Sequence, residues 1–278
     1  MSLDLAFQDY GEGPPLVILH GLFGSGRNWT GIARRLAEAW HVYALDLRNH
    51  GDSPWAEAMD YPAMADDVGA FLDRQGLDRV ALVGHSMGGK TAMALALTQP
   101  ARIGSLTVVD IAPVAYPQTH QGYVEALQAL DLSGIMRRAD ADAALQSSVP
   151  EAGIRAFLLQ NLVARDGGFT WRFNLAALGA GMAEISGFPE APGQGAYDGR
   201  TLFLGGGLSD YITAAHQDTI RRLFPRASVE TVAGAGHWVH AEAPEPFLEA
   251  LQGFLAGTVD PRGRAGSERG VDDDVQRT

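Results

Sequence analysis

One serine in this sequence lies between glycines at the point where a short apolar run ends. In the stretch RVALVGHSMGGK, residues 79–90, Ser86 is flanked by Gly84 and Gly88. The nucleophile of many serine hydrolases lies on such a strand-to-helix turn, where small neighbours let the chain fold back and expose the hydroxyl. A G-x-S-x-G pattern arises easily by chance in a glycine-rich chain, but here the helix-prone GKTAMALALTQ follows the apolar run. We therefore predict that Ser86 is a nucleophile.

A serine hydroxyl is a weak nucleophile at its ordinary pKa and needs a neighbouring base. His237 is our candidate, because it lies on a glycine-rich loop in VAGAGHWVHAEAP after the last predicted strand. In hydrolases whose nucleophile lies on such a turn, the histidine is the last of the three catalytic residues along the chain. His237 and His240 also match H-x-x-H, but no cysteine or carboxylate stands at ligand spacing, so we expect no metal. We expect His85 to pack beside the turn and His50 to hold a loop.

The acid that would orient His237 has several candidates. Such an acid often follows a later strand in a pattern like G-x-x-D, and the strand here ends FLGGGLSDY. Counting from the second of its glycines gives Ser209, whereas counting from the third gives Asp210. Asp110 in VVDIAP closes an earlier apolar strand, where a carboxylate could instead cap a turn. The spacing alone leaves these alternatives open.

The oxyanion formed during acyl transfer needs two hydrogen-bond donors. We predict the backbone N–H of Met87, the residue after the nucleophile, as the first donor. The second should come from the loop after an early strand, and HGLFGSGRNW, residues 20–29, offers Leu22. This chemistry requires no cofactor.

Alternating strand and helix patterns would position these residues. Six short apolar runs predict strands at 14–21, 41–46, 79–84, 103–110, 201–206 and 228–232. Helices are predicted at 28–39, 62–76, 88–98, 212–223 and 244–256. Several runs are apolar on both faces, which is typical of central strands in a parallel sheet covered by helices. The pattern predicts an α/β fold, with a mostly parallel central sheet and helices on both faces.

The alternation breaks between about 114 and 196, where the sequence is helix-prone and shows no convincing strand. We expect a helical cap there, inserted into a single domain that covers residues 1–256. Its apolar side chains would suit an acyl chain, although each could equally pack the cap onto the core: Phe157, Leu158, Leu162, Phe169, Trp171, Phe173 and Leu175. Residues 257–278 are charged and poor in large apolar groups, so we expect a disordered tail.

The composition of the chain excludes several classes of binding partner and several kinds of site. The formal net charge is −12 and there are no long basic clusters, which argues against nucleic-acid binding. The absence of cysteine excludes disulfides, thiolate metal sites and a cysteine nucleophile. We see neither a signal peptide nor an apolar run long enough to span a membrane, so we expect a cytoplasmic protein. The oligomeric state does not follow from the sequence.

Several stretches together resemble the small α/β-hydrolase esterases of the YbfF type. They are HGLFGSGRNW, LDLRNHGDSP, GHSMGGK, VVDIAPVAY, WRFNLAAL and AGAGHWVHAEAP, and the resemblance runs from about residue 14 to 256. It implies a carboxylesterase acting on short or medium acyl esters, with some thioesterase activity. It also implies that Asp110 is the acid, with Ser209 as a helper and Asp210 as the alternative.

The same residues would serve other reactions, because a fold does not fix a function. A carbon–carbon bond hydrolase, an enol-lactonase or a cofactor-free perhydrolase would carry a similar set. A second class is a non-catalytic ligand receptor on a hydrolase scaffold, which predicts ligand binding with little turnover. A third is an interaction protein that uses its tail. The presence of every residue type needed for the serine mechanism favours an enzyme with a small-molecule acyl ester or thioester as substrate.

Overall fold

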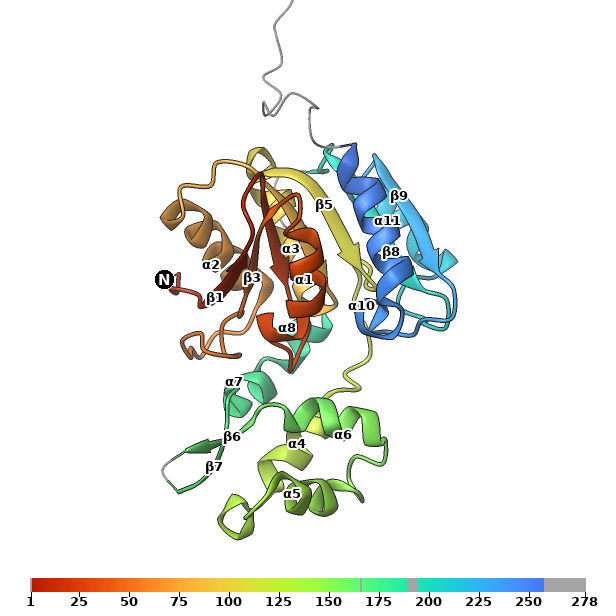
Figure 1. Cartoon of the computed structure of the whole chain (residues 1–278). Helices are drawn as coiled ribbons and strands as arrows, with labels where there is room; N and C mark the ends of the chain where they lie inside the picture. Colours follow the sequence, from red (N-terminus) through yellow and green to blue (C-terminus); the bar gives the residue numbers. More distant parts are fainter. Residues whose placement is uncertain (1, 166, 190–194, 258–278) are drawn as a thin grey trace, which may run out of the picture.

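The structure is a computed structural model that describes residues 2–165, 167–189 and 195–257. Its centre is a seven-stranded sheet in the order β1-β3-β2-β4-β5-β8-β9 (Figure 1). The strands are β1 (Phe7–Tyr10), β2 (Pro15–Leu19), β3 (His41–Leu45), β4 (Val80–His85), β5 (Ile103–Val109), β8 (Arg200–Gly206) and β9 (Ala227–Val232). β1 pairs antiparallel with β3, and every other pairing is parallel. The mostly parallel sheet predicted from the sequence is confirmed.

Helices cover both faces of this sheet. Alternate residues of β2 enter different apolar clusters: Val17 and Leu19 pack with α2 and α3, whereas Leu16 and Ile18 pack with α1 and α11. The helices of the main body are α1 (Thr30–Leu36), α2 (Tyr61–Arg74), α3 (Met87–Thr98), α9 (Gln217–Leu223), α10 (Val239–Glu242) and α11 (Pro244–Ala256). Burial on both faces explains why the central strands read as continuous apolar runs.

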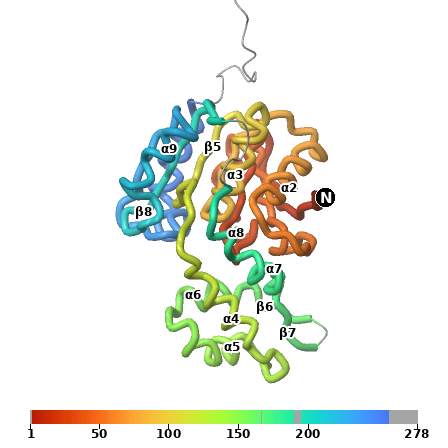
Figure 2. The backbone as a smooth tube through the Cα atoms, turned by 180° about the vertical axis from the view of Figure 1, so that it is seen from behind, coloured from red at the N-terminus to blue at the C-terminus, as the bar shows by residue number. Residues whose placement is uncertain are grey.

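Most of the described chain between β5 and β8 forms a separate lobe, which we call the insertion lobe (Figures 1 and 2). It contains α4 (Gln121–Ala129), α5 (Arg138–Leu145), α6 (Ala152–Leu159), β6 (Leu162–Arg165), β7 (Gly168–Trp171), α7 (Leu175–Ala180) and α8 (Met182–Ser186). The prediction that this segment lacks strands was wrong, because β6 and β7 form an antiparallel hairpin. Each strand has four residues and pairs only with the other, so neither gives a long apolar run.

The lobe is tied to the main body beside α3. The Lys90 ammonium donates hydrogen bonds to the carbonyls of Ser186 at 2.9 Å and Gly187 at 2.5 Å. The Tyr61 hydroxyl donates to the carbonyl of Ile185 at 2.5 Å. Figure 2 shows α8 returning along the main body at this place. These bonds fix where the insertion lobe ends and the sheet resumes.

The six strands predicted from the sequence are confirmed, with ends shifted by one or two residues. β1 was missed, because FQDY is an exposed-to-intermediate edge strand with little apolar content. The predicted helix at 28–39 begins as a 3₁₀ turn, Gly26–Trp29, and α1 ends at Leu36. The predicted disordered tail lies outside the described residues from residue 258 on. Within the described ranges, no helix is both long enough and apolar enough to cross a membrane.

Candidate active site

The predicted site residues come together at the carboxyl ends of neighbouring strands. Ser86 follows β4, Asp110 follows β5, and His237 lies on the loop after β9. Leu22 lies on the loop after β2, which pairs with β4. In sheets of this kind, the carboxyl edge is where ligand sites form. The insertion lobe lies at the same end of the sheet (Figure 1).

The turn that carries Ser86 has a strained backbone and depends on its glycines. Ser86 has φ +52° and ψ −119°, outside the regions that most residues adopt. A Cβ on Gly84 would lie 2.3 Å from the carbonyl oxygen of Gly88, and a Cβ on Gly88 would lie 2.5 Å from that of Leu19. No side chain fits at either position without moving the backbone. The G-x-S-x-G spacing is therefore a steric requirement of this turn.

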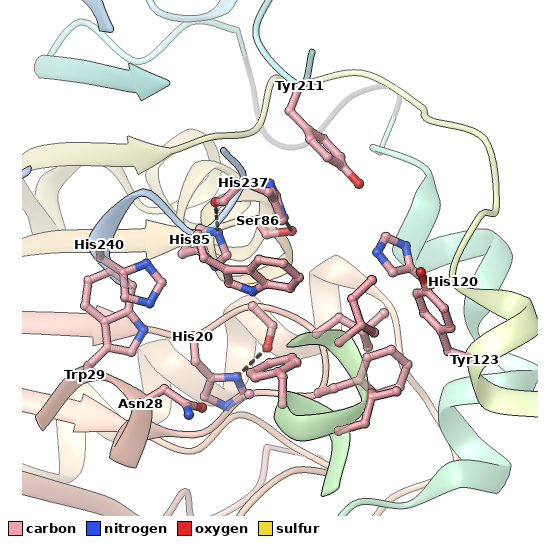
Figure 3. Close-up of a pocket in the computed structure, with 18 of the residues that line it drawn as sticks. His20, Asn28, Trp29, His85, Ser86, His120, Tyr123, Tyr211, His237 and His240 are labelled. Carbon is pink, nitrogen blue, oxygen red and sulfur yellow. Dashed lines mark hydrogen bonds between the residues drawn. The ribbon is translucent and has the colours of Figure 1, made fainter. Parts of the chain in front are cut away.

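A hydrogen-bonded series joins the three side chains. The Ser86 hydroxyl lies 3.1 Å from Nε2 of His237, and Nδ1 of His237 lies 2.7 Å from Oδ2 of Asp110. The carboxylate accepts a hydrogen bond from the Nδ1–H of His237, which leaves Nε2 as an acceptor facing the serine. The His237 side chain is 19% exposed, whereas Asp110 is fully buried. Figure 3 shows His237 beside Ser86, at the wall of a cavity.

Asp110 is held from several sides. Its Oδ1 accepts the N–H of Gly206 at 2.9 Å, and its Oδ2 also accepts the Ser209 hydroxyl at 2.5 Å. Its backbone adopts φ +49°, a conformation that aspartate tolerates better than most residues. Asp210 is exposed, one residue beyond Ser209. The structure thus brings Asp110 and Ser209 to His237 as one cluster and leaves Asp210 at the surface.

Backbone donors lie near the serine hydroxyl. α3 begins at Met87, and the first N–H groups of a helix have no partner within the helix. The loop after β2 passes close by, since a Cβ on Gly21 would lie 3.2 Å from Cβ of Ser86. Leu22, the next residue, lines the space in front of Ser86. Both residues predicted to carry the donors therefore lie next to Ser86.

Two cavities meet at Ser86. The larger has a volume of about 240 Å³ and the smaller about 30 Å³. Leu22, Ser86, His120 and Tyr211 line both, so the serine lies at their junction. Apolar side chains from the loop after β2, the insertion lobe and the loop after β9 dominate the larger cavity: Leu22, Phe23, Ile154, Phe157, Leu158 and Trp238. An apolar chain therefore fits on one side of the Ser86 hydroxyl.

Two residues that line the cavities beside Ser86, Tyr211 and His120, were not predicted from the sequence. The ring of Tyr211 stacks on that of His237, with centroids 4.2 Å apart. His120 reaches the junction from the start of α4, and burial lowers its pKa to about 4. Of the seven lobe residues proposed for an acyl chain, only Phe157 and Leu158 line the larger cavity. Trp171 and Phe173 are buried and stack on each other.

A cluster of buried neutral histidines supports the site. Burial lowers the pKa of His20 to about 4 and that of His50 and His240 to about 3. Burial also lowers the pKa of His85, whose Nε2 lies 2.9 Å from the His237 carbonyl oxygen. As expected, His85 packs beside the turn and His50 holds a loop. His240 stacks on Trp29, with ring centroids 4.0 Å apart.

His240 should make the fold sensitive to acid. An unfolded histidine binds a proton near pH 6.5, whereas folded His240 does so only near pH 3, so the unfolded state binds more protons between these values. The stabilising contribution is complete above pH 6.5 and is lost progressively as pH falls through this window. At pH 5 the loss is about 2 kcal/mol. Urea unfolding of the wild type at pH 7 and pH 5 measures this loss together with those of His20, His50 and His85, so a variant without His240 is needed to isolate it.

His240→Phe provides the control, because Nδ1 of His240 has no hydrogen-bond partner among the described residues and phenylalanine can keep the stack on Trp29. We expect the variant to lose about 2 kcal/mol less than the wild type between the two pH values. Equal losses in both proteins would contradict the assignment of a buried neutral His240.

Comparison with known proteins identifies the family of this fold. The family model for the alpha/beta hydrolase fold matches residues 14–161. The chain is 45% identical over 251 residues to the sn-1-specific diacylglycerol lipase ABHD11 of Mus musculus, covering 87% of this chain and 81% of that protein. It is 40% identical over 249 residues to esterase YbfF of Escherichia coli K12, covering 89% of this chain and 95% of that protein. A solved marine microorganism esterase superposes with a TM-score of 0.89 at 39% identity, covering 91% of this chain and 100% of that chain.

The fold and the relatives define the class. This chain belongs to the α/β-hydrolase family, within the group that includes esterase YbfF and ABHD11. The family resemblance predicted from the sequence is confirmed.

Proposed function

We propose that this chain, a carboxylic ester hydrolase of the α/β-hydrolase family, cleaves short- to medium-chain acyl esters through an acyl-enzyme on Ser86. The observation that carries the proposal is the hydrogen-bonded series from Ser86 through His237 to Asp110 beside an apolar cavity. This arrangement can remove a proton from a hydroxyl that faces a bound acyl group.

The reaction proceeds in two halves. The Ser86 oxygen attacks the acyl carbonyl while Nε2 of His237 takes the hydroxyl proton, and Asp110 stabilises the resulting imidazolium. The N–H groups of Leu22 and Met87 hold the tetrahedral oxyanion. The C–O bond to the alcohol then breaks, and His237 gives its proton to the leaving oxygen. Water attacks the acyl-enzyme with His237 again as base, which releases the acid and restores Ser86.

The half-buried Ser209 and the fully buried Asp110 serve the same mechanism. Two hydrogen bonds to the carboxylate, from Ser209 and Gly206, orient it toward Nδ1 of His237. The insertion lobe acts as a cap, because its residues His120, Ile154 and Phe157 close the larger cavity over the serine. A thioester would react in the same way, with a thiol as leaving group.

The cavity predicts a preference for acyl length. Each buried methylene contributes about 0.8 kcal/mol, so butyrate should exceed acetate by about tenfold in kcat/KM. A palmitoyl chain would outgrow a cavity of about 240 Å³, and its kcat/KM should fall again. Initial rates on p-nitrophenyl acetate, butyrate, octanoate and palmitate test this, with Ser86→Ala as the blank. A flat profile across all four esters would contradict acyl binding in the larger cavity.

A further inference from the structure

The residue after the proposed oxyanion donor has an unfavourable backbone. Phe23 adopts φ +61° and is 2% exposed. Left-handed backbone angles are uncommon outside glycine, and for a bulky residue they persist only where surrounding contacts enforce them. Phe23 directly follows Leu22, and only the two backbone torsions of Leu22 separate the Leu22 N–H from the peptide bond that Leu22 shares with Phe23. Whatever holds Phe23 therefore also holds the proposed oxyanion donor.

One contact comes from the main body. The Phe23 N–H donates to Nε2 of His50 at 3.2 Å. Nδ1 of His50 lies 2.9 Å from the carbonyl oxygen of Arg48, to which it donates, so Nε2 is left as an acceptor. Burial lowers the pKa of His50 to about 3, which keeps this acceptor neutral at ordinary pH. This side of the Phe23 backbone is fixed by the loop after β3.

The opposite contact comes from the insertion lobe. Nδ2 of Asn161 donates to the carbonyl oxygen of Phe23 at 2.8 Å, across 138 residues of chain. Asn161 is 5% exposed and lies between α6 and β6. Its own carbonyl accepts the N–H of Arg172, which anchors it within the lobe. The backbone of Phe23 is thus hydrogen-bonded to the main body through its N–H and to the insertion lobe through its carbonyl.

We propose that Asn161 is a positioning residue whose hydrogen bond to the Phe23 carbonyl fixes the Leu22 N–H for the oxyanion, so that the seated insertion lobe completes the oxyanion hole. The inference rests on the proposed esterase mechanism, since it assigns Asn161 a part in stabilising the tetrahedral intermediate. Asn161 itself touches no reacting atom.

This role predicts a particular kinetic signature. Charge on the oxyanion develops only in the transition state, so a displaced donor lowers kcat and leaves ground-state binding nearly unchanged. Deleting one oxyanion donor costs about 10²–10³ in kcat. Misplacing one should cost less, and we expect Asn161→Ala to lower kcat about 10- to 100-fold, with KM altered by less than about threefold.

The chain provides a matched control in the preceding residue. Gln160 is exposed and also joins the lobe to the main body, since its Oε1 accepts Nδ2 of Asn28 at 2.9 Å. Gln160→Ala removes a lobe-to-body hydrogen bond but leaves Phe23 held. Asn161→Asp keeps the size of the side chain while it replaces the donor with an acceptor. We expect Asn161→Asp to resemble Asn161→Ala in kcat, and Gln160→Ala to remain within about twofold of wild type.

The experiment measures kcat and KM on p-nitrophenyl butyrate, with kcat expressed per site titrated by a p-nitrophenyl phosphonate. It also compares inhibition by a trifluoromethyl ketone, which forms a tetrahedral adduct, with inhibition by the matching methyl ketone. For Asn161→Ala we expect weaker trifluoromethyl ketone inhibition in step with kcat, and unchanged methyl ketone inhibition. Titration removes any contribution from misfolded protein.

Two results would overturn the inference, and they differ from each other. If wild type hydrolyses the ester and Asn161→Ala equals Gln160→Ala in kcat per titrated site, Asn161 has no positioning role and the proposed function stands. If wild type shows no hydrolysis that Ser86→Ala abolishes, the proposed function fails and the inference fails with it.

Discussion

Ser86→Ala should lower kcat on p-nitrophenyl butyrate by about 10⁵-fold or more, because the reaction loses the atom that accepts the acyl group. The remaining rate comes from binding and from the oxyanion donors, which still act on a water molecule. Alanine should be tolerated by the fold, because the turn depends on Gly84 and Gly88 rather than on the hydroxyl. Steady-state kinetics on the purified variant measure the effect.

An exposed serine provides the comparison. Ser133 lies in the insertion lobe, where its hydroxyl donates to Asp131. Ser133→Ala should leave kcat within about twofold of wild type, as expected for a surface change. If Ser86→Ala retained a tenth of wild-type kcat, the nucleophile would have to be a different group.

Asp110→Asn should lower kcat by about 10⁴-fold, because an amide in place of the carboxylate favours the wrong histidine tautomer and cannot stabilise the imidazolium. The amide has the same shape and can still accept the Gly206 N–H through its oxygen. Asp210→Asn should leave kcat within about threefold, since Asp210 is exposed. The pair of variants, assayed side by side on one ester, separates the two candidate acids.

The opposite result for the two variants would identify the other aspartate as the acid. A large loss in Asp210→Asn with near-normal turnover in Asp110→Asn would assign the acid to Asp210. It would require a rearrangement of the loop after β8, because the described structure joins Asp110 to Nδ1 of His237 at 2.7 Å.

The central sheet could be predicted because its strands are apolar on both faces, as β4 with its VALVGH run illustrates. The same signal is absent from β1, which is an edge strand, and from the β6–β7 hairpin, whose strands pair only with each other. Local sequence predicts strands buried by helices well, and strands defined by pairing alone poorly.

Some residues of the candidate site could also be predicted from local sequence, whereas others could not. Ser86 was predicted because steric demands of its turn force glycines at fixed spacing, which sequence records directly. His120, Tyr211 and Asn161 were not, because their places depend on how the lobe and the loops dock against the main body. The one-residue ambiguity between Ser209 and Asp210 reflects the loop after β8, where local pattern does not define which side chain turns inward.

The most direct measurement is to mix the wild-type enzyme with p-nitrophenyl butyrate, quench with acid within the first turnover, and map the acyl group by peptide mass spectrometry. We predict a butyryl group on the peptide that contains Ser86, formed at the rate of the initial nitrophenol burst and absent in Ser86→Ala. Nitrophenol release without any acylated peptide, or with the acyl group on another residue, would contradict the assignment of Ser86 as the nucleophile.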